Sequence, residues 1–423
     1  MSKPSWKPSL PPLLRDRAFR RYWSGATVSL LGDRISGLAV PLAAIISLHA
    51  GPSQMGALTA ASLVPALLFS VPLGVWVDRS QSKRRLMIAA DILRAVLISF
   101  IPAAFLLGHL SLAELYAVAF LVGSLGLLFQ LAQNSLFPAL VEREQYVDAS
   151  ALLQGSRAVS YLAGPSIGGF LVQVLSAPIA VLFDALSYLA SALALLGISP
   201  KEPPPAPRAK GDGGAGLRFL WGSPILRPAL LAVATVNLFN YIFSALFLLY
   251  ASRTLHVDAA LIGLIAGLGV IGTMSGALVA SRTSRRIGVG RTFLLGTALF
   301  PAPLVLVPLA GGPHLLVLAL LLLAEMGSGF GVMLLDISFG ALWTASLPDE
   351  IRARVNGAFS FVNNGIRPIG ALLGGALPTL IGIHGTLWLG ALGALLGCLW
   401  LLPSPIPSLR NLETQGQASP LGT

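Results

Sequence analysis

The chain has 423 residues, of which 55% are hydrophobic and 11% are charged, and its mean hydropathy is +0.79. Soluble domains carry roughly a quarter charged residues, so this composition excludes a soluble globular protein. The net charge of +11 does not indicate a nucleic-acid-binding face, because the basic residues are spread over short loops between apolar segments. The single cysteine, Cys398, excludes intrachain disulfides and a cysteine metal cluster.

Long apolar segments recur along the whole chain. Stretches of about 20 apolar residues are typical of membrane-spanning helices. We therefore predict an all-α membrane protein with twelve transmembrane helices. The predicted spans are Phe19–Leu48, Gln54–Val77, Leu86–Leu107, Leu112–Leu140, Ala149–Leu175, Pro178–Ile198, Leu226–Ala251, Ala260–Ala280, Thr292–Ala310, Leu315–Ala345, Val355–Ile381 and Gly385–Leu402.

The basic residues alternate between the connections. Most of the 28 Lys and Arg residues lie in the two tails and the even-numbered connections, whereas the odd-numbered connections hold only Arg253. The positive-inside rule then places both termini in the cytoplasm. We expect a multi-pass protein of the bacterial cytoplasmic (inner) membrane. The basic residues that break the pattern are the arginines inside spans: Arg34, Arg94, Arg157 and Arg367.

The sixth connection divides the chain into two sets of six spans. Lys201–Gly216 is rich in Pro, Gly and charge, which is typical of a flexible linker. The halves are weakly similar, since Pro165 in span 5 is echoed by Pro368 in span 11. Two pseudo-symmetric six-helix halves with a site at their interface are typical of transporters. The expected parts are an N-terminal tail (1–18), a first half (19–198), a linker (199–225), a second half (226–402) and a C-terminal tail (403–423).

The loop after the second span carries a recognisable motif. It reads Gly74-Val-Trp-Val-Asp78-Arg79-Ser-Gln-Ser-Lys83-Arg84-Arg85 and resembles the signature G-x-x-x-D-R-x-G-x-[RK]-[RK] of the major facilitator superfamily, with Gln81 in place of the second glycine. A glycine at position 74 would let another helix approach closely. The carboxylate at position 78 is placed to face the positive N-terminal end of a helix in the other half. The resemblance implies that span 11 is this partner and that the loop is a cytoplasmic gate; the alternative is that its basic residues only set topology.

Span 5 contains a second motif, Ser160-Tyr-Leu-Ala-Gly164-Pro165-Ser-Ile-Gly168-Gly169. It resembles the antiporter motif of the same superfamily, which ties it to exporters. Ser160, Gly164 and Gly168 are four residues apart and therefore share one helix face. Pro165 removes a backbone donor and permits a bend. The alternative interpretation is tight helix packing of a kind that any membrane bundle shows.

Ionisable residues inside spans are costly, at roughly 2.5–3.5 kcal/mol each on insertion scales. Burial disfavours the charged form of a carboxyl group, so a buried carboxylate can take up and release a proton as a cavity alternates between the two membrane faces. Asp33, Asp91 and Glu325 are our candidates for proton coupling, followed by Asp336. Arg94 lies at i+3 from Asp91, so the two can pair. The alternative is that such pairs only neutralise each other and fix helix packing.

Three further charges are assigned lesser roles. For Arg157 and Arg367 we favour structural pairing, and Asp184 is expected near the outer end of span 6, where burial is mild. Span 4 has no arginine, although many drug–proton antiporters carry one there, so the chain departs at this point from the proton-coupled pattern.

Polar side chains among aromatics suggest a cavity for an amphiphilic ligand. The competing explanation is amide bonding between helices beside lipid-facing aromatics. The candidates for the substrate cavity are Arg34, Gln133, Asn134, Asn237, Asn240, Phe243, Asn363 and Asn364.

The start of the chain narrows the resemblance to one branch of the superfamily. The stretch from Leu14 to Pro41, with Asp91-Ile-Leu-Arg94 and Phe183-Asp184, resembles macrolide efflux pumps and enterobactin-type siderophore exporters. The resemblance implies a monomeric, proton-coupled antiporter that exports a small amphiphilic drug or metabolite by alternating access, surrounded by membrane lipids. We expect no enzymatic activity, no cofactor, no metal and no nucleic-acid partner, because no phosphate loop or catalytic cluster is recognisable. A lipid or lysolipid flippase and a transport-inactive membrane sensor are the alternatives.

Overall fold

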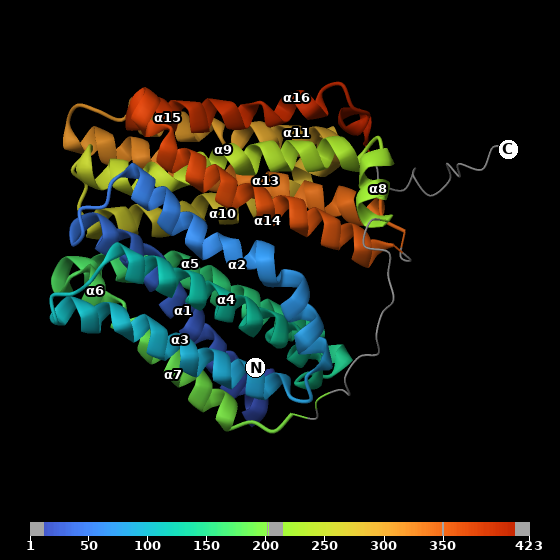
Figure 1. Ribbon diagram of the computed structural model, residues 1–423. Coiled ribbons are helices and arrows are strands. Elements are labelled where there is room, and N and C mark those ends of the chain that lie inside the picture. The colour runs from blue at the N-terminus through green and yellow to red at the C-terminus, as the bar shows by residue number, and fades with distance from the viewer. Residues whose placement is uncertain (1–11, 201, 203–214, 349–350, 411–423) are drawn as a thin grey trace, which may run out of the picture.

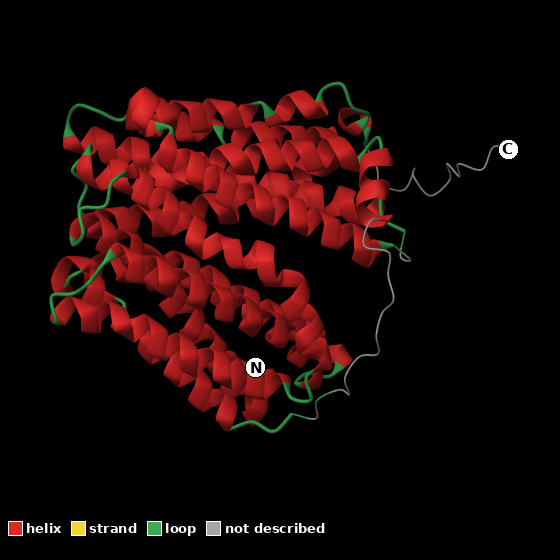
Figure 2. Cartoon of the chain, in the orientation of Figure 1, coloured by secondary structure: helices red, strands yellow, loops and turns green. Residues whose placement is uncertain are grey.

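The computed structural model describes residues 12–200, 202, 215–348 and 351–410. Within these ranges it consists of helices and short connections, with no strand (Figure 2). The ends of the two expected tails and residues 201 and 203–214 of the expected linker lie outside the described residues.

The first group of helices comprises the six spans before the linker. Helices α1, α3 and α4 begin at polar residues, Asp16, Ser82 and Ser111, whose side chains accept the backbone N–H groups three residues later. Helix α1 packs against α5 and α7, α3 packs against α4 and α7, and α2 packs against α4. The bounds are α1 (Arg17–Ile46), α2 (Pro52–Arg79), α3 (Lys83–Leu106), α4 (Leu112–Leu136), α5 (Tyr146–Leu175), α6 (Ala177–Ala180) and α7 (Leu182–Leu196).

The second group follows the linker and has the same number of spans. Helix α13 packs against α10 and α11, and α9 packs against α14 and α15 (Figure 1). Two spans are interrupted: α11 passes through a short 3-10 turn (Ala302–Val305) into α12, and α15 continues into α16. The bounds are α8 (Ala215–Gly222), α9 (Leu226–Arg253), α10 (Ala259–Ile287), α11 (Val289–Leu299), α12 (Leu306–Leu309), α13 (His314–Ala345), α14 (Arg352–Ala376), α15 (Pro378–Leu395) and α16 (Gly397–Leu401).

The span count needs one refinement. Among the described residues, eleven helices are long and apolar enough to cross a membrane. The predicted span that is not counted is the eleventh, Val355–Ile381, which corresponds to α14, a continuous helix of 25 residues that is too polar to be counted with them. It carries Asn363, Asn364 and Arg367 in its middle turns. Its neighbours are α2 of the first group and α9 of the second, and all three polar side chains are partly buried.

The two groups meet at one end of the bundle only. We call the end with α8 and the α2–α3 connection the linker end, and the other the closed end (right and left in Figure 1). At the closed end one apolar core is common to both groups, with Ala44, Leu246 and Ala259 among its members. Towards the linker end each group has separate core clusters, one around Met87 and another around Phe293. The helices accordingly diverge towards the linker end in Figure 1.

Specific contacts seal the closed end. Helix α5 packs so closely on α10 at Gly169 that a methyl group added there would overlap the carbonyl oxygen of Ala259. Helix α2 packs on α14, where the Ser53 hydroxyl donates to the Gly375 carbonyl oxygen at 3.1 Å. Arg253 donates from Nη2 to the carbonyl oxygen of Ile45 at 2.9 Å, which ties the end of α9 to the end of α1.

Candidate functional site

A cavity of about 740 Å³ lies between the helix groups and is lined mainly by the first. Its walls come from α1, α2, α3, α4, α5 and α7, with Ser244, Ala245 and Leu248 of α9 closing one side. This volume is within the range of about 300–1,000 Å³ typical of small-molecule sites. The cavity is the natural place for a transported ligand.

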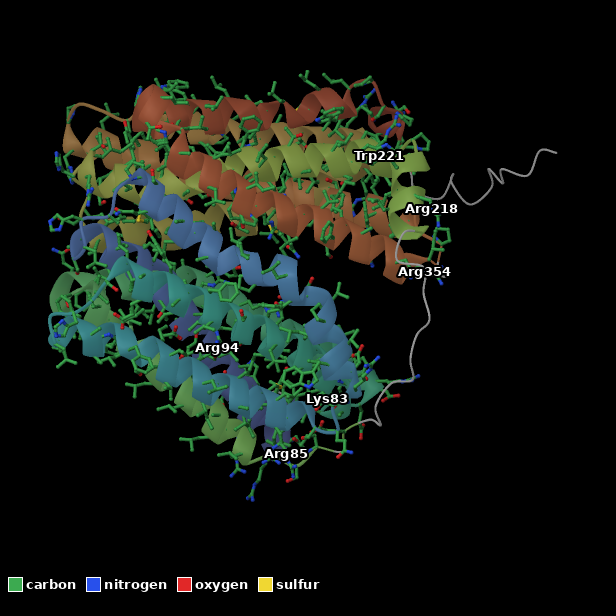
Figure 3. The ribbon with its side chains drawn as sticks, viewed as in Figure 1. Lys83, Arg85, Arg94, Arg218, Trp221 and Arg354 are labelled. Carbon is green, nitrogen blue, oxygen red and sulfur yellow. The ribbon has the colours of Figure 1, made fainter. Side chains whose placement is uncertain are left out.

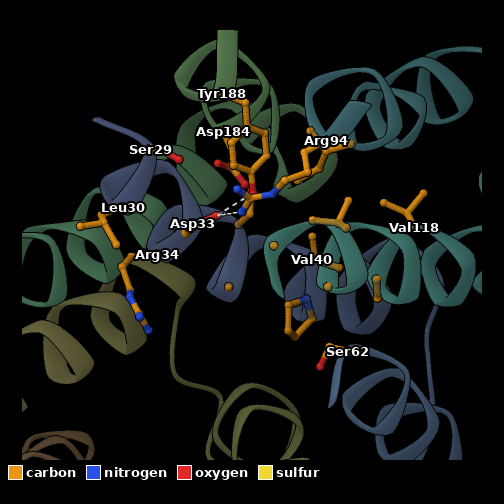
Figure 4. A pocket seen from close by; sticks show the side chains of 18 of the residues that line it. Ser29, Leu30, Asp33, Arg34, Val40, Ser62, Arg94, Val118, Asp184 and Tyr188 are labelled. Atoms are coloured by element: carbon orange, nitrogen blue, oxygen red, sulfur yellow. Dashed lines mark hydrogen bonds and ion pairs between the residues drawn. The ribbon is translucent and has the colours of Figure 1, made fainter. Parts of the chain in front are cut away.

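A charged cluster forms part of the cavity wall (Figure 4). Arg94 of α3 donates from Nη2 to Asp33 Oδ1 on α1 at 2.6 Å and to the Tyr188 hydroxyl on α7 at 2.8 Å. The Tyr188 hydroxyl in turn donates to Asp33 Oδ1 at 2.6 Å. The guanidinium also lies over the Tyr188 ring, with Cζ 3.9 Å from the ring centroid. Three helices are therefore joined through one arginine.

Small residues on α1 make this geometry possible. A methyl group added at Gly32 would overlap Ser187 Oγ and Asp184 Oδ1 of α7. Helices α1 and α7 can therefore approach closely, and the next residue, Asp33, reaches both Tyr188 and Arg94.

Two more carboxylates complete the cluster behind this layer. The Asp91 side chain has no exposed surface, and its Oδ1 lies 3.4 Å from Arg94 Nη1, which confirms the pairing that the i, i+3 spacing predicted. The Asp184 side chain accepts from Ser187 Oγ at 3.0 Å. The second carboxylate oxygen of each aspartate has no hydrogen-bond partner in the described part of the chain. One arginine thus serves three buried or half-buried carboxyl groups.

The expectation for Asp184 was wrong. The residue is fully buried, not mildly exposed near an outer end. Asp184 lies within the span Ala177–Leu196, where Gly32 of α1 lets α7 approach so closely that a methyl group at Gly32 would overlap Asp184 Oδ1. Hydropathy along the chain does not reveal such a close approach.

The other two proton-coupling candidates lie in the second helix group and form no cluster. Glu325 of α13 packs against Gly269 of α10 and makes no hydrogen bond or ion pair with another described residue. Asp336 is exposed, and Arg367 of α14 is the charged group that acts on it. The structure therefore brings Asp33, Asp91 and Arg94 together but leaves Glu325 and Asp336 apart from them.

The gate residues are not engaged with the other helix group. A methyl group at Gly74 would meet nothing within 4 Å, and Asp78 and Arg79 are exposed. The basic residues of the loop instead bind their own group: Lys83 Nζ donates to the Ser80 carbonyl, and Arg84 donates to the carbonyl oxygens of Leu195 and Leu196, all at 2.8 Å. In Figure 3, Lys83 and Arg85 lie at the linker end of the first group, away from Arg354 of α14. The contact with span 11 is thus absent from this conformation of the described residues.

The antiporter motif packs on two helices. Gly164 and Gly168 face α1, against Arg34 and Ile35, whereas Gly169 faces Ala259 of α10 across the two groups. Ser160 is buried on the same side of α5 as the first two glycines. Helix α5 runs unbroken through Pro165, whose carbonyl oxygen lies against Gly263 of α10.

The cavity candidates divide into two sets. Arg34 and Gln133 line the cavity, as do Asp33 and Arg94. Asn237 and Asn363 instead bond to each other, Nδ2 to Oδ1 at 3.0 Å, and join α9 to α14. The described cavity lining also excludes Asn134, Asn240 and Asn364. It excludes Phe243 as well, because this side chain is buried in the core against Gly390.

For two residues of the cavity wall, the functional role expected from the sequence was too small. Arg157 lines the cavity, and within the described part of the chain its side chain contacts the amide Oε1 of Gln154 at 3.5 Å and no acid, so the expected structural pairing is wrong for it. Tyr161, which received no role, lies under Arg34, with its ring centroid 3.8 Å from Cζ. The helical spacing of Arg157 and Tyr161 places both on one face of α5 and could have linked them.

Comparisons with known proteins agree with this architecture. The family model of the Major Facilitator Superfamily matches residues 22–371 and 229–422. The chain belongs to the major facilitator superfamily. It is 27% identical over 405 residues to the multidrug efflux pump Tap of Mycobacterium tuberculosis (strain ATCC 25618 / H37Rv), covering 92% of this chain and 93% of that protein. It is also 27% identical to the enterobactin exporter EntS of Escherichia coli O127:H6, with 90% of each chain covered.

Solved structures share the fold of this superfamily member. The nucleoside transporter NupG superposes with a TM-score of 0.69 at 15% identity, covering 91% of this chain and 98% of that chain. A bacterial homologue of the iron transporter ferroportin in an inward-facing state gives a TM-score of 0.70 at 18% identity, covering 93% and 99%. The predicted fold and the resemblance to an efflux branch of the superfamily are both confirmed.

Proposed function

We propose that this superfamily transporter is a proton-coupled antiporter that exports an amphiphilic drug or metabolite across the bacterial cytoplasmic membrane. The observation that carries the proposal is the cluster of Asp33, Asp91 and Asp184 around Arg94, which reaches the cavity through Asp33. Relatives named as a multidrug efflux pump and an enterobactin exporter support export of a small molecule.

Asp33 is the group through which protons would enter the cluster. Its side chain is 34% exposed, compared with 6% for Arg94 and 0% for Asp91. An ionised Asp33 accepts hydrogen bonds from Arg94 and Tyr188. Protonation of Asp33 would remove its attraction for the guanidinium, and Arg94 could then move towards Asp91, now 3.4 Å away. Arg94 therefore has two arrangements, one towards Asp33 and one towards Asp91, and protonation of Asp33 shifts the balance between them.

This movement would act on the packing of three helices. Asp33, Arg94 and Tyr188 lie on α1, α3 and α7, and α1 also packs on α5 through Gly164 and Gly168. Helix α5 in turn holds the closed end together through Gly169. A change at Asp33 can thus be transmitted along packed helices to the contact that separates the cavity from the outside.

The gate loop would close the opposite side. The positive-inside rule predicts that the linker end is cytoplasmic, and with that orientation the cavity would open inward. In the outward-facing state Gly74 and Asp78 would meet α14, with Arg79, Lys83 and Arg84 beside them. We expect a monomer with both termini in the cytoplasm, surrounded by membrane lipids.

The proposal is tested by substrate uptake into proteoliposomes with and without an imposed pH gradient. A panel of macrolides, cationic dyes, siderophores and lysolipids would be applied at the cytoplasmic face. Accumulation that needs an acidic interior supports proton antiport. Lysolipid movement that is equally fast without a gradient would replace the proposal by a flippase on the same fold.

A further inference from the structure

A pair of arginines on the cavity wall has no acidic partner in the described part of the protein. Arg34 of α1 and Arg157 of α5 both line the cavity. Arg34 lies over the ring of Tyr161, and Arg157 is one helical turn from that ring on the same helix. One guanidinium therefore covers the aromatic ring while the second comes from the same face of α5, and Figure 4 shows that Arg34 points away from Asp33.

Neither arginine is neutralised by the residues that the structure describes. Both ion pairs found among them belong to Arg94. The Nε of Arg34 is buried without a hydrogen-bond partner, and Arg157 has only a long contact with the amide of Gln154. Leaving the buried Nε of Arg34 without an acceptor is costly, and the exposed Arg157 side chain lies on the same cavity wall. A ligand that brings a negatively charged acceptor would relieve this cost and would also attract Arg157.

The acids on the opposite wall do not offer the same opportunity to a cation. Asp33 already accepts from Arg94 and Tyr188. Asp91 is fully buried and does not line the cavity. Asp184 lines the cavity, but its side chain has no exposed surface and already accepts from Ser187 Oγ. The cavity wall thus presents two guanidiniums without an acidic partner among the described residues, whereas its carboxylates are already hydrogen-bonded.

We propose that the substrate of this cavity is an acidic amphiphile, bound through carboxylate, phosphate, sulfonate or ionised phenol groups by Arg34 and Arg157. This inference rests on the proposed transport function, because it assigns the charge of the exported molecule. Guanidinium groups match the planar geometry of such anions and can donate two hydrogen bonds at once. The partly exposed Tyr161 ring and the apolar side chains of Leu30, Val40 and Leu248 would cover the ring or hydrocarbon part of the ligand.

The antiporter motif then has a second role, which is to position Arg34. A methyl group at Gly164 would overlap the Cβ of Arg34. The missing side chain lets the stem of Arg34 lie flat on α5, and this places the guanidinium over Tyr161. Gly164 is a positioning residue in this scheme and does not touch the ligand.

The test uses two dyes that share a xanthene skeleton but differ in charge. Binding of anionic carboxyfluorescein and cationic rhodamine 123 would be measured by fluorescence anisotropy on the full chain in phosphatidylcholine nanodiscs, without a pH gradient. We expect tighter binding of carboxyfluorescein. Arg34→Gln and Arg157→Gln should each weaken it by at least about tenfold, as for the loss of a charge-assisted hydrogen bond, while Arg157→Lys should restore part of the affinity.

A monodisperse gel-filtration peak and unchanged rhodamine 123 binding would show that the variants are folded. Any of three results would overturn the inference. The wild type could bind rhodamine 123 as tightly as carboxyfluorescein or more tightly, or it could bind neither dye. The third result is a carboxyfluorescein affinity that is unchanged when both arginines are replaced. Because binding is measured without transport, export could still be observed after such a result. Anion binding without any export would instead count against the proposed function alone.

Discussion

The two helix groups treat intramembrane charge in opposite ways. In the first, Arg94 gathers Asp33 and Asp91 into one network that also includes Tyr188. In the second, Glu325 has no polar partner among the described residues, and Asp336 is exposed near Arg367. Both groups share a six-span plan, but among the described residues only the first has an arginine that forms ion pairs with its acids. We infer that the shared fold supplies the moving halves, while the coupling chemistry is concentrated in the first group.

The largest effect is expected from removing the shared cation. Arg94→Gln would leave three acids without their cation and should lower the free energy of unfolding by about 3–5 kcal/mol, as for breaking a buried ion pair. Transport should be lost as well. Unfolding of the purified protein in increasing dodecyl sulfate would measure the change.

Arg157→Gln is the matched control, because it removes another intramembrane arginine that has no acidic partner among the described residues. Its effect on stability should stay within about 1 kcal/mol. Equal destabilisation by the two variants would contradict the view that Arg94 holds a cluster together.

The next effect concerns the contact between the groups. Gly169→Ala would place a methyl group against the Ala259 carbonyl, and such overpacking costs about 1–3 kcal/mol. The closed end should therefore open more often. Spin labels at Leu107 and Leu315, both exposed at the closed end, would report longer distances in a Cys398→Ser background.

Glycines without neighbours provide the controls for this prediction. Gly37→Ala, on α1, meets nothing within 4 Å and should leave the distances unchanged. Gly74→Ala also meets nothing in this conformation, but it would hinder closure of the linker end. It should shift the distances in the opposite direction, and a shift in the same direction would refute the assignment of Gly74 to the gate.

A smaller effect on stability is expected in the second group. Glu325→Gln removes no ion pair or hydrogen bond found in the described structure, so unfolding should change by less than about 0.5–1 kcal/mol. Asp33→Asn, which disturbs bonds to Arg94 and Tyr188, should destabilise more. The reverse order would show that Glu325 has a structural partner and that the contrast between the groups is false.

The smallest effect should come from the amides between α9 and α14. Asn237→Ala removes the bond to Asn363 and should cost about 0.6 kcal/mol, the average for hydrogen bonds between membrane helices. Asn240→Ala is its control, since the Asn240 side chain makes no hydrogen bond within the described structure. Identical stabilities of both variants would show that the bond contributes nothing.

Much of the architecture is accessible from the sequence because apolar length and basic loops directly reflect the membrane. The i, i+3 spacing likewise predicted the contact between Asp91 and Arg94. The shorter contact of Arg94, with Asp33, joins residues 61 positions apart, and helical periodicity carries no information about such a pair. That contact depends on how closely α1 and α7 approach at Gly32.

Three placements related to function were harder to predict. The burial of Asp184 depends on the close approach of α1 and α7 at Gly32, which hydropathy does not show. Asp78 is exposed in this conformation, and the gate contact that we propose for it belongs to the outward-facing state. Whether Arg157 pairs with an acid depends on the packing of the helices, since a sequence does not show which carboxylates are within reach.

The central claim is that proton coupling runs through the first helix group. The most direct test is proton release from acidified inside-out vesicles, followed with a pH-quenched dye while candidate substrates are added. We predict dequenching with at least one compound for the wild type, none for Asp33→Asn in a correctly folded protein, and normal substrate binding in both. Full coupling retained in both Asp33→Asn and Asp91→Asn would contradict this claim, and loss of coupling in Glu325→Gln alone would assign it to the second group.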